Sequence, residues 1–421
     1  MRRSVLTYIL LLSAVLLSAQ PPLKTVPDLD FARFSLNHIA FDGDSSAFGK
    51  LFSKMDTLFL EGKGKVSVLH MGGSHVQGGT MTRALRNDLL SVGTEFGVLG
   101  DLDGGRGLVF PFSAAKTNNP SSFKTRVEGE WTSAKSVQRE PSSRLGLSGM
   151  AVSTSDTTAS LRIVLVPRHQ GPEDVHMSFS SVRVLGWSAG GGMEPVVVSD
   201  CGDTLAGVPA DSSWLFSLPC LQDSVKIAFR GGKGPFTLTG VYLDRDEPGI
   251  TVSGVGVNGA SLVAYSRCQD LERDLALVHP DLAVLAIGIN DAMPVDFSGE
   301  AFKARYRALI ARIRSVNPDC ALLFVTNNDS FRRSRKRGYY VNANGEKARA
   351  AFKELCAECG GGVWDQYEIM GGTGSMRKWE LAGMARRDKI HFTDEGYTIL
   401  GDLLYDALME KYNEHLNRTG R

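Results

Sequence analysis

The sequence predicts an α/β protein: a doubly wound, flavodoxin-like domain with a five-stranded parallel sheet, interrupted by an inserted β-sandwich. Continuously apolar strands alternate with helices near the start of the chain and again from residue 249 onward. This pattern is typical of a parallel sheet that is covered on both faces. Between these parts, residues 104–248 contain many short β-rich runs separated by Gly, Pro and Asp, and no convincing helix. That spacing favours a sandwich.

The alternating part gives the expected elements directly. Apolar runs predict sheet strands at 66–70, 249–255, 281–288, 321–327 and 361–367. Amphipathic periodicity predicts helices at 46–61, 80–92, 261–279, 300–315, 345–359 and 394–416. We therefore expect a lead-in with one helix over 20–64, the α/β domain over 65–103 and 249–421, and the sandwich over 104–248.

The first residues have the composition of a secretory signal. Arg2 and Arg3 precede an apolar run, which ends in Ser18-Ala19-Gln20. This order matches the charged, apolar and small-residue regions of a signal peptide over 1–19, with cleavage near Ala19. The alternative is a retained N-terminal anchor, although the run is short for a bilayer. We therefore expect a secreted or periplasmic protein with no stable membrane insertion after cleavage.

Composition and charge limit the possible partners. The chain has 421 residues, of which 43% are hydrophobic and 22% charged, as in globular proteins. The formal net charge is +1, and removal of residues 1–19, which contain two arginines and no acidic residue, changes it to about −1. Near-neutral charge argues against nucleic acid as a partner. The oligomeric state is left open.

The six cysteines predict no metal site. Cys201 and Cys220 flank a turn-rich segment, and in an oxidising compartment we expect them to form a disulfide. Cys356 and Cys359 form a C-x-x-C on a predicted helix, but no second Cys/His pair stands nearby. We interpret them as small packed residues. The histidines are scattered, and we expect neither a metal nor an organic cofactor.

Chemistry-bearing residues follow the predicted strands. Ser74 comes after a buried strand and two glycines, Gly259 follows the second strand, and Asn290 follows the third. In an open parallel sheet the site lies at these carboxyl ends. A serine needs a base, which His391 supplies, and Asp388 can hold the imidazole in the correct tautomer. The backbone N–H groups of Ser74 and Gly259 and the Asn290 amide are then candidate oxyanion donors.

These residues resemble the four sequence blocks of the SGNH (GDSL-type) hydrolases. The resemblance is carried by Ser74, Gly259, Asn290 within G-I-N-D, and His391 within D-K-I-H, and it covers 65–93 and 249–416. It implies a serine esterase with Ser74 as nucleophile, His391 as base and Asp388 as its orienting acid. A β-domain inserted after the first block further resembles secreted carbohydrate O-acetylesterases, including those that act on peptidoglycan.

The nucleophile block departs from the family pattern. The family usually has Gly-Asp-Ser, but Gly73 stands here in place of the aspartate. A literal Gly-Asp-Ser occurs at Gly43-Asp44-Ser45, where no buried strand precedes it and Ser45 or Ser46 is better interpreted as a helix N-cap. We therefore favour Ser74, and leave open a catalytically inactive homologue.

Four further features have weaker functional interpretations. The run Gly254 to Gly259 matches G-x-G-x-x-G, but no acidic residue ends the next strand as a dinucleotide site requires. The basic run 332–337 is expected to be a solvated loop, with a border of the site as the alternative. His75 is either a substrate contact or a structural histidine, and Trp379 with residues 370–375 is a candidate pocket wall.

The sequence thus predicts a secreted serine esterase that removes O-acetyl or other small acyl groups from a polysaccharide or peptidoglycan. The alternative is a non-catalytic carbohydrate-binding or cell-surface protein on a decayed hydrolase core. Which glycan is bound and which acyl group is removed do not follow from the sequence.

Overall fold

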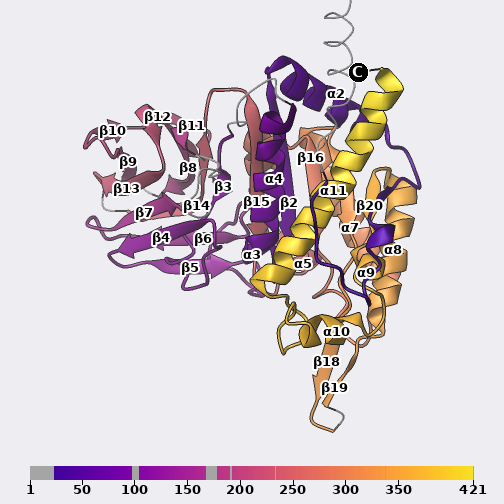
Figure 1. Ribbon diagram of the computed structural model, residues 1–421. Helices are drawn as coiled ribbons and strands as arrows, with labels where there is room; N and C mark the ends of the chain where they lie inside the picture. The colour runs from indigo at the N-terminus through magenta and orange to yellow at the C-terminus, as the bar shows by residue number, and fades with distance from the viewer. Residues whose placement is uncertain are drawn as a thin grey trace, which may run out of the picture.

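The computed structural model describes residues 23–96, 104–166, 178–189, 192–232, 234–336 and 338–420. The predicted signal over 1–19 lies outside these residues. Figure 1 shows two parts side by side, a β-rich region and a sheet flanked by helices. Among the described residues, no helix is both long and apolar enough to span a bilayer.

The central sheet has six strands rather than the predicted five. Its order is β1 (Ile39–Ala40), β20 (Gly362–Trp364), β17 (Ala321–Val325), β16 (Leu282–Ala286), β2 (Lys65–Gly72) and β15 (Gly249–Gly256). The five predicted strands run parallel. The sixth, β1, pairs antiparallel with β20 through Ile39 and Trp364. β1 has only two residues, too few for a periodic pattern, so it is defined as a strand by its pairing with β20 alone.

Helices cover both faces of this sheet. One layer contains α2 (Ser46–Glu61), α4 (Thr80–Phe96) and α11 (Asp394–Thr419), which pack on one another. The other contains α6 (Leu271–Val278), α7 (Gly299–Val316) and α8 (Asn344–Cys359). The shared core is built from fully buried aliphatic and aromatic side chains, including Leu69, Leu285 and Phe324. Because both faces are covered, the strands are apolar along most of their length.

The helix predicted over 261–279 is broken into two, and this prediction is wrong in detail. The structure has α5 (Leu262–Ser266), then a turn, then α6. In the turn, Asp270 N–H donates to the carbonyl of Leu145, 3.0 Å away, and Arg144 forms an ion pair with the Asp270 carboxylate. Bonds to the β-rich region therefore replace the bonds that would continue the helix.

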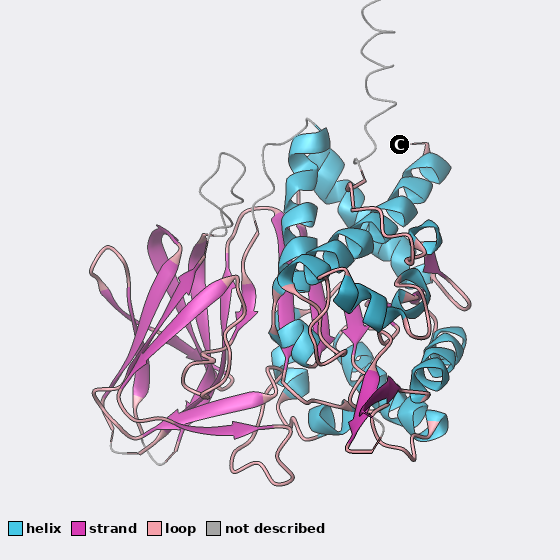
Figure 2. Ribbon diagram, turned by 60° about the horizontal axis from the view of Figure 1, so that its bottom comes forward, coloured by secondary structure: helices cyan, strands magenta, loops and turns pink. Residues whose placement is uncertain are grey.

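The β-rich region consists of two antiparallel sheets (Figure 2). One contains β4 (Phe123–Glu128), β7 (Ser160–Leu165), β9 (Glu194–Val198), β10 (Thr204–Ala206) and β13 (Ser224–Arg230). The other contains β3 (Gly107–Val109), β5 (Thr132–Lys135), β6 (Met150–Thr154), β8 (Phe179–Ser188), β11 (Val208–Ala210), β12 (Ser213–Gln222) and β14 (Phe236–Asp244). Phe229 of the first sheet and Phe236 of the second pack with ring centroids 4.9 Å apart.

Further elements gather at the carboxyl ends of the parallel strands. Figure 1 shows α3 (Ser74–Gln77), α5 and α10 (Ser375–Leu381) at the lower end of the sheet, with the hairpin β18 (Phe331–Ser334) and β19 (Gly338–Val341) below. Another short helix, α9 (Gln366–Ile369), lies between β20 and α10 in the sequence. The predicted site residues lie at this end.

Candidate active site

Ser74 stands on a sharp turn between β2 and α3. A Cβ added to Gly72 would lie 2.4 Å from Val76 Cγ2 and 3.0 Å from the Ala286 carbonyl oxygen, so this position has no room for a side chain. The N–H groups of Val76 and Gln77 both donate to the Gly73 carbonyl, at 3.2 and 3.0 Å. The strand therefore changes at once into a helical turn, with Ser74 as its first residue.

Ser74, His391 and Asp388 form a hydrogen-bonded relay. Ser74 Oγ lies 2.8 Å from His391 Nε2, although the two residues are 317 positions apart. His391 Nδ1 lies 2.9 Å from Asp388 Oδ2. With the proton on Nδ1, the imidazole donates to Asp388 and Nε2 accepts from the Ser74 hydroxyl. This arrangement prepares the serine to lose its proton.

The loop that carries Asp388 and His391 is a tight turn. Arg386 N–H donates to the His391 carbonyl at 2.8 Å, and Lys389 has a left-handed φ of 59°. Asp388 Oδ1 accepts from Ile390 N–H and His391 N–H, at 2.9 and 3.0 Å. Partial burial raises the pKa of Asp388, but the bonds from His391 and Ile390 outweigh it and lower this pKa below its usual range. Asp388 is therefore held ionised and fixed.

The predicted oxyanion donors lie around Gly73 and Ser74. A Cβ on Gly73 would be 3.3 Å from Asn290 Nδ2 and 3.3 Å from the Ala260 carbonyl oxygen, so the amide sits against this turn. Asn290 Nδ2 donates one hydrogen to the Ala260 carbonyl at 2.9 Å, which leaves the second hydrogen for another acceptor. Gly259, with φ of 80°, precedes Ala260 in an exposed turn. The structure thus brings Ser74, Gly259 and Asn290 together.

Gln77 is a residue that the sequence analysis missed. It is 2% exposed, and its Oε1 accepts from Asn258 N–H at 2.7 Å, next to Gly259. Its Nε2 lies 3.0 Å from Thr117 Oγ1 and 3.0 Å from Asn118 Oδ1. Gln77 therefore ties the helix that begins at Ser74 to the Gly259 turn and to the loop before β4. Its spacing from Ser74 carries no motif, and only the fold reveals these contacts.

His75 packs against the imidazole of His391. Its ring centroid lies 4.9 Å from that of His391, at an interplanar angle of 31°, and its Nδ1 is 2.8 Å from the Tyr397 hydroxyl. Burial lowers the pKa of His75 to about 3, and the nearby His391 acts in the same direction. His75 is therefore neutral at physiological pH. It buttresses His391, which favours the structural alternative over a substrate contact.

Asp291 and the β18–β19 hairpin hold the Asn290 loop. The Asp291 carboxylate accepts from Leu262 N–H at 3.1 Å, and burial raises its pKa to about 6. Arg332 donates to the carbonyls of Ala292 and Pro294, at 3.2 and 3.0 Å. One arginine of the basic run therefore braces the segment after Asn290, while Arg333 and Arg335 are more exposed.

The hairpin also reaches the loop that carries Asp388. Phe331 N–H donates to the Lys389 carbonyl at 3.0 Å. Trp379, the candidate pocket wall, is fully buried instead, and its Nε1 donates to the Met370 carbonyl at 2.8 Å. Its ring packs edge-on against Phe392, next to His391. Trp379 therefore supports the His391 loop from the core, and the pocket-wall prediction is wrong.

Two glycines of the G-x-G-x-x-G run, Gly254 and Gly256, have an internal packing role. A Cβ on Gly256 would lie 2.4 Å from Gln77 N and 2.5 Å from the Gly73 carbonyl oxygen, and one on Gly254 would lie 3.0 Å from Thr82 Cγ2. Gly256 therefore lets β15 approach the serine turn and α3 closely, and Gly254 lets it approach α4.

The cysteines form no metal site among the described residues, where no group of three His, Cys, Asp or Glu side chains could hold an ion. Cys356 is buried in α8 and Cys359 half-buried. Cys201 and Cys220 are exposed, with their sulfurs 3.0 Å apart and not bonded in the structure. Their oxidation in an exported protein stays a prediction.

Comparisons with known proteins identify the fold. Residues 232–399 match the GDSL-like Lipase/Acylhydrolase family, a stretch that contains Gly259, Asn290, Asp388 and His391 but not Ser74. A solved structure of a peptidoglycan O-acetylesterase superposes with a TM-score of 0.71 at 21% identity, over 89% of this chain and 99% of that chain.

Two other solved structures match over a smaller part. An acetyl xylan esterase matches with a TM-score of 0.31 at 18% identity, over 38% of this chain and 81% of that chain. A GDSL-like lipase from Bacteroides thetaiotaomicron matches with a TM-score of 0.29 at 16% identity, over 38% of this chain and 76% of that chain. A search of curated proteins finds no match.

Proposed function

The chain carries a GDSL/SGNH lipase-acylhydrolase domain, and from this premise we propose that it is a serine esterase that removes acetyl or similar small acyl groups from a polysaccharide. The observation that carries the proposal is the relay from Ser74 Oγ to His391 Nε2 at 2.8 Å and from His391 Nδ1 to Asp388 Oδ2 at 2.9 Å.

The proposed reaction has two halves. Ser74 Oγ attacks the ester carbonyl carbon while His391 Nε2 takes the hydroxyl proton, and the ionised Asp388 stabilises the imidazolium that forms. The tetrahedral intermediate collapses when the C–O bond to the sugar breaks and His391 returns the proton to the sugar oxygen. Water then attacks the acyl-serine with His391 again as base, which releases the acid and restores Ser74.

The oxyanion of each intermediate needs donors that are in place beforehand. The Ser74 N–H, the Gly259 N–H and the second hydrogen of the Asn290 amide are the proposed donors. Asn290 is already held by its bond to Ala260, so little reorganisation is needed when charge develops. Every proton transfer of this route uses side chains of the chain itself.

The substrate class rests on two supports. The superposed structure over 89% of the chain is a peptidoglycan O-acetylesterase, which makes an acetylated glycan the leading candidate. The predicted signal over 1–19 would export the protein to the compartment in which such polymers lie. We therefore propose a periplasmic or secreted enzyme whose substrate is an O-acetylated polysaccharide or peptidoglycan.

Acetate release tests this proposal. The purified protein is incubated with p-nitrophenyl acetate, acetylated xylan and O-acetylated peptidoglycan, with Ser74→Ala protein as the matched control. We expect the wild type to release acetate from the small ester and from at least one polymer, and the variant to release none above background. A folded wild type that is inactive on all three would favour the non-catalytic alternative.

A further inference from the structure

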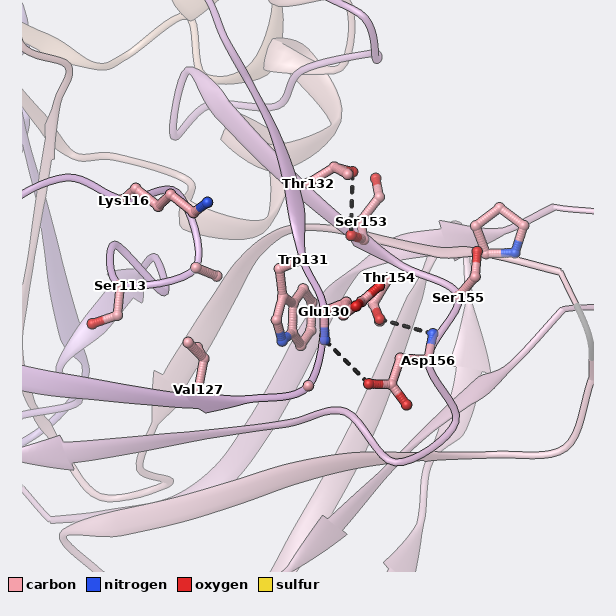
Figure 3. Close-up of a pocket in the computed structure, with 13 residues that line it drawn as sticks. Ser113, Lys116, Val127, Glu130, Trp131, Thr132, Ser153, Thr154, Ser155 and Asp156 are labelled. Carbon is pink, nitrogen blue, oxygen red and sulfur yellow. Dashed lines mark hydrogen bonds between the residues drawn. The ribbon is translucent and has the colours of Figure 1, made fainter.

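The β-rich region contains a hollow of about 720 Å³ that is separate from the serine relay. It lies between the loop at 113–116, the segment at 127–132 that joins β4 to β5, and residues 153–156, which form the end of β6 and the start of the following turn. Figure 3 shows Trp131 near its middle, with Ser113 and Lys116 on one side and Ser155 and Asp156 on the other. All of these residues are among those that the structure describes.

Trp131 is held as a fixed aromatic surface. Its Nε1 donates to the Glu128 carbonyl at 2.9 Å, and its ring packs edge-on against Phe229 with centroids 5.8 Å apart. The side chain is half-buried, so part of the indole remains open to the hollow. A rigid ring with one accessible part binds a flat apolar ligand surface at a low cost in conformational entropy.

The polar groups around the ring are also fixed. Asp156 Oδ2 accepts from Glu130 N–H at 3.1 Å, and its Oδ1 accepts from Thr158 N–H at 2.8 Å. The Thr158 hydroxyl also donates to Oδ1, at 2.6 Å; this bond lowers the pKa of Asp156 most, the two N–H bonds lower it further, and the carboxylate stays ionised as an acceptor. The remaining lining is mostly hydroxyl-bearing, with Lys116 as its single cation beside Glu130 and Asp156.

This chemistry selects among ligand classes. A phosphate-bearing ligand would be repelled by two carboxylates and attracted by only one cation. An aliphatic chain would lie mainly against hydroxyl groups, with which it forms no hydrogen bonds. A sugar ring has an apolar face of C–H groups for the indole and several hydroxyls for the carboxylate and hydroxyl partners. We propose that the hollow around Trp131 is a binding subsite for an oligosaccharide segment.

The hollow is connected to the catalytic residues by one loop. Lys116 lines the hollow, and the next two residues, Thr117 and Asn118, receive the hydrogen bonds of Gln77, three positions after Ser74. Asn118 Oδ1 also accepts from Asn258 Nδ2 at 2.7 Å, beside Gly259. A polymer held at Trp131 therefore lies against the loop that contacts the serine turn. The inference deepens the proposed function: its turnover part rests on that function, and its binding part does not.

Binding is measured on full-length Ser74→Ala protein, which cannot consume an ester. Isothermal titration calorimetry uses chitohexaose and xylohexaose, and a pull-down uses isolated peptidoglycan. Trp131→Ala is the test, and Trp214→Ala is the matched control, since Trp214 is a half-buried tryptophan of the same region that does not line the hollow. We expect at least one probe to bind, and Trp131→Ala to weaken it about tenfold, or about 1.4 kcal/mol, with Trp214→Ala within about twofold.

The second part of the test measures ester hydrolysis by protein that keeps Ser74. Trp131→Ala should lower kcat/KM on an acetylated polymer and leave p-nitrophenyl acetate hydrolysis unchanged. If Trp131→Ala destabilises the fold, Trp131→Phe, which keeps an aromatic ring against Phe229, and Asp156→Asn replace it. Absence of binding to all probes, or equal binding by the Trp131 and Trp214 variants, would overturn the inference. A wild type that binds but releases no acetate would overturn the proposed function and leave the subsite standing.

Discussion

Two serines of this chain stand at the start of a helix, Ser45 after Gly43-Asp44 and Ser74 after Gly72-Gly73, yet their surroundings differ completely. Ser45 belongs to the literal Gly-Asp-Ser, but the Asp44 carboxylate there accepts from Ser46 N–H at 2.9 Å and holds the first turn of α2. Ser74 follows a buried parallel strand and is hydrogen-bonded to His391. The position of a serine relative to the sheet, rather than the letters beside it, decides whether a base can reach it.

A histidine also lies near Ser45, which makes the comparison sharper. His415 and Ser45 line one hollow of about 310 Å³ at the far end of α11. His415 directs Nε2 to the buried carboxylate of Asp56 at 3.0 Å, and among the described residues no hydrogen bond joins Ser45 to it. His415 is therefore a buried structural residue between α2 and α11.

The largest expected effect therefore separates the two serines. Ser74→Ala should lower kcat for p-nitrophenyl acetate by about 10⁴–10⁶, because the nucleophile is lost while the fold stays intact. Ser45→Ala should leave kcat unchanged. Labelling with an organophosphonate followed by peptide mapping checks the assignment, and modification at Ser45 would reverse it.

The second expected effect concerns the donor beside Ser74. Asn290→Ala removes the amide that donates to Ala260 and is proposed to donate to the oxyanion, so kcat should fall by about 10²–10³ with little change in KM. A turn residue with no catalytic role would give a lower melting temperature and a near-normal kcat. Both quantities measured on one preparation distinguish these roles.

How far the sequence predicts this molecule depends on the range of the interaction. Periodicity predicted the five parallel strands and the span of α2, Ser46–Glu61, since these depend on local pattern and burial. Periodicity could not predict β1, because its two residues form a strand only through their pairing with β20. It also could not predict the break before α6, which is caused by the hydrogen bond from Asp270 N–H to the Leu145 carbonyl.

The site divides in the same way. Family motifs pointed to Ser74, Asn290 and His391, which the structure brings together, but those assignments as catalytic residues stay predictions. Gln77 and Tyr397 carried no signal, because their partners lie 40 and 322 positions away and become neighbours only in the fold. Contacts between distant segments that carry no motif are the part that a single sequence leaves out.

Gln77 gives the third prediction, since it connects the serine turn to both neighbouring loops. Gln77→Ala removes the bonds to Asn258 and to the 117–118 loop, and kcat should fall about 10–10²-fold through misplacement of the Gly259 turn. Gln77→Glu keeps an acceptor for Asn258 N–H and loses the donors to the loop. It should retain more kcat on the small ester and lose more kcat/KM on a polymer. Equal losses on both substrates in both variants would indicate a general packing role.

The smallest expected effect concerns Gly73, which precedes Ser74 at the position where the literal Gly-Asp-Ser motif has Asp44 before Ser45. Its φ of −103° lies outside the left-handed region that favours glycine, but a Cβ would stand 3.3 Å from both Asn290 Nδ2 and the Ala260 carbonyl oxygen. Gly73→Ala should therefore displace the amide slightly and lower kcat by about 2–10-fold. Gly73→Asp adds a carboxylate beside the hydrogen that the oxyanion needs, so its kcat should be lower than that of Gly73→Ala. Steady-state kinetics of the two variants test this prediction. A gain in kcat for Gly73→Asp alone would contradict it, and would mean that the glycine lowers activity and that an aspartate before the serine supports faster catalysis.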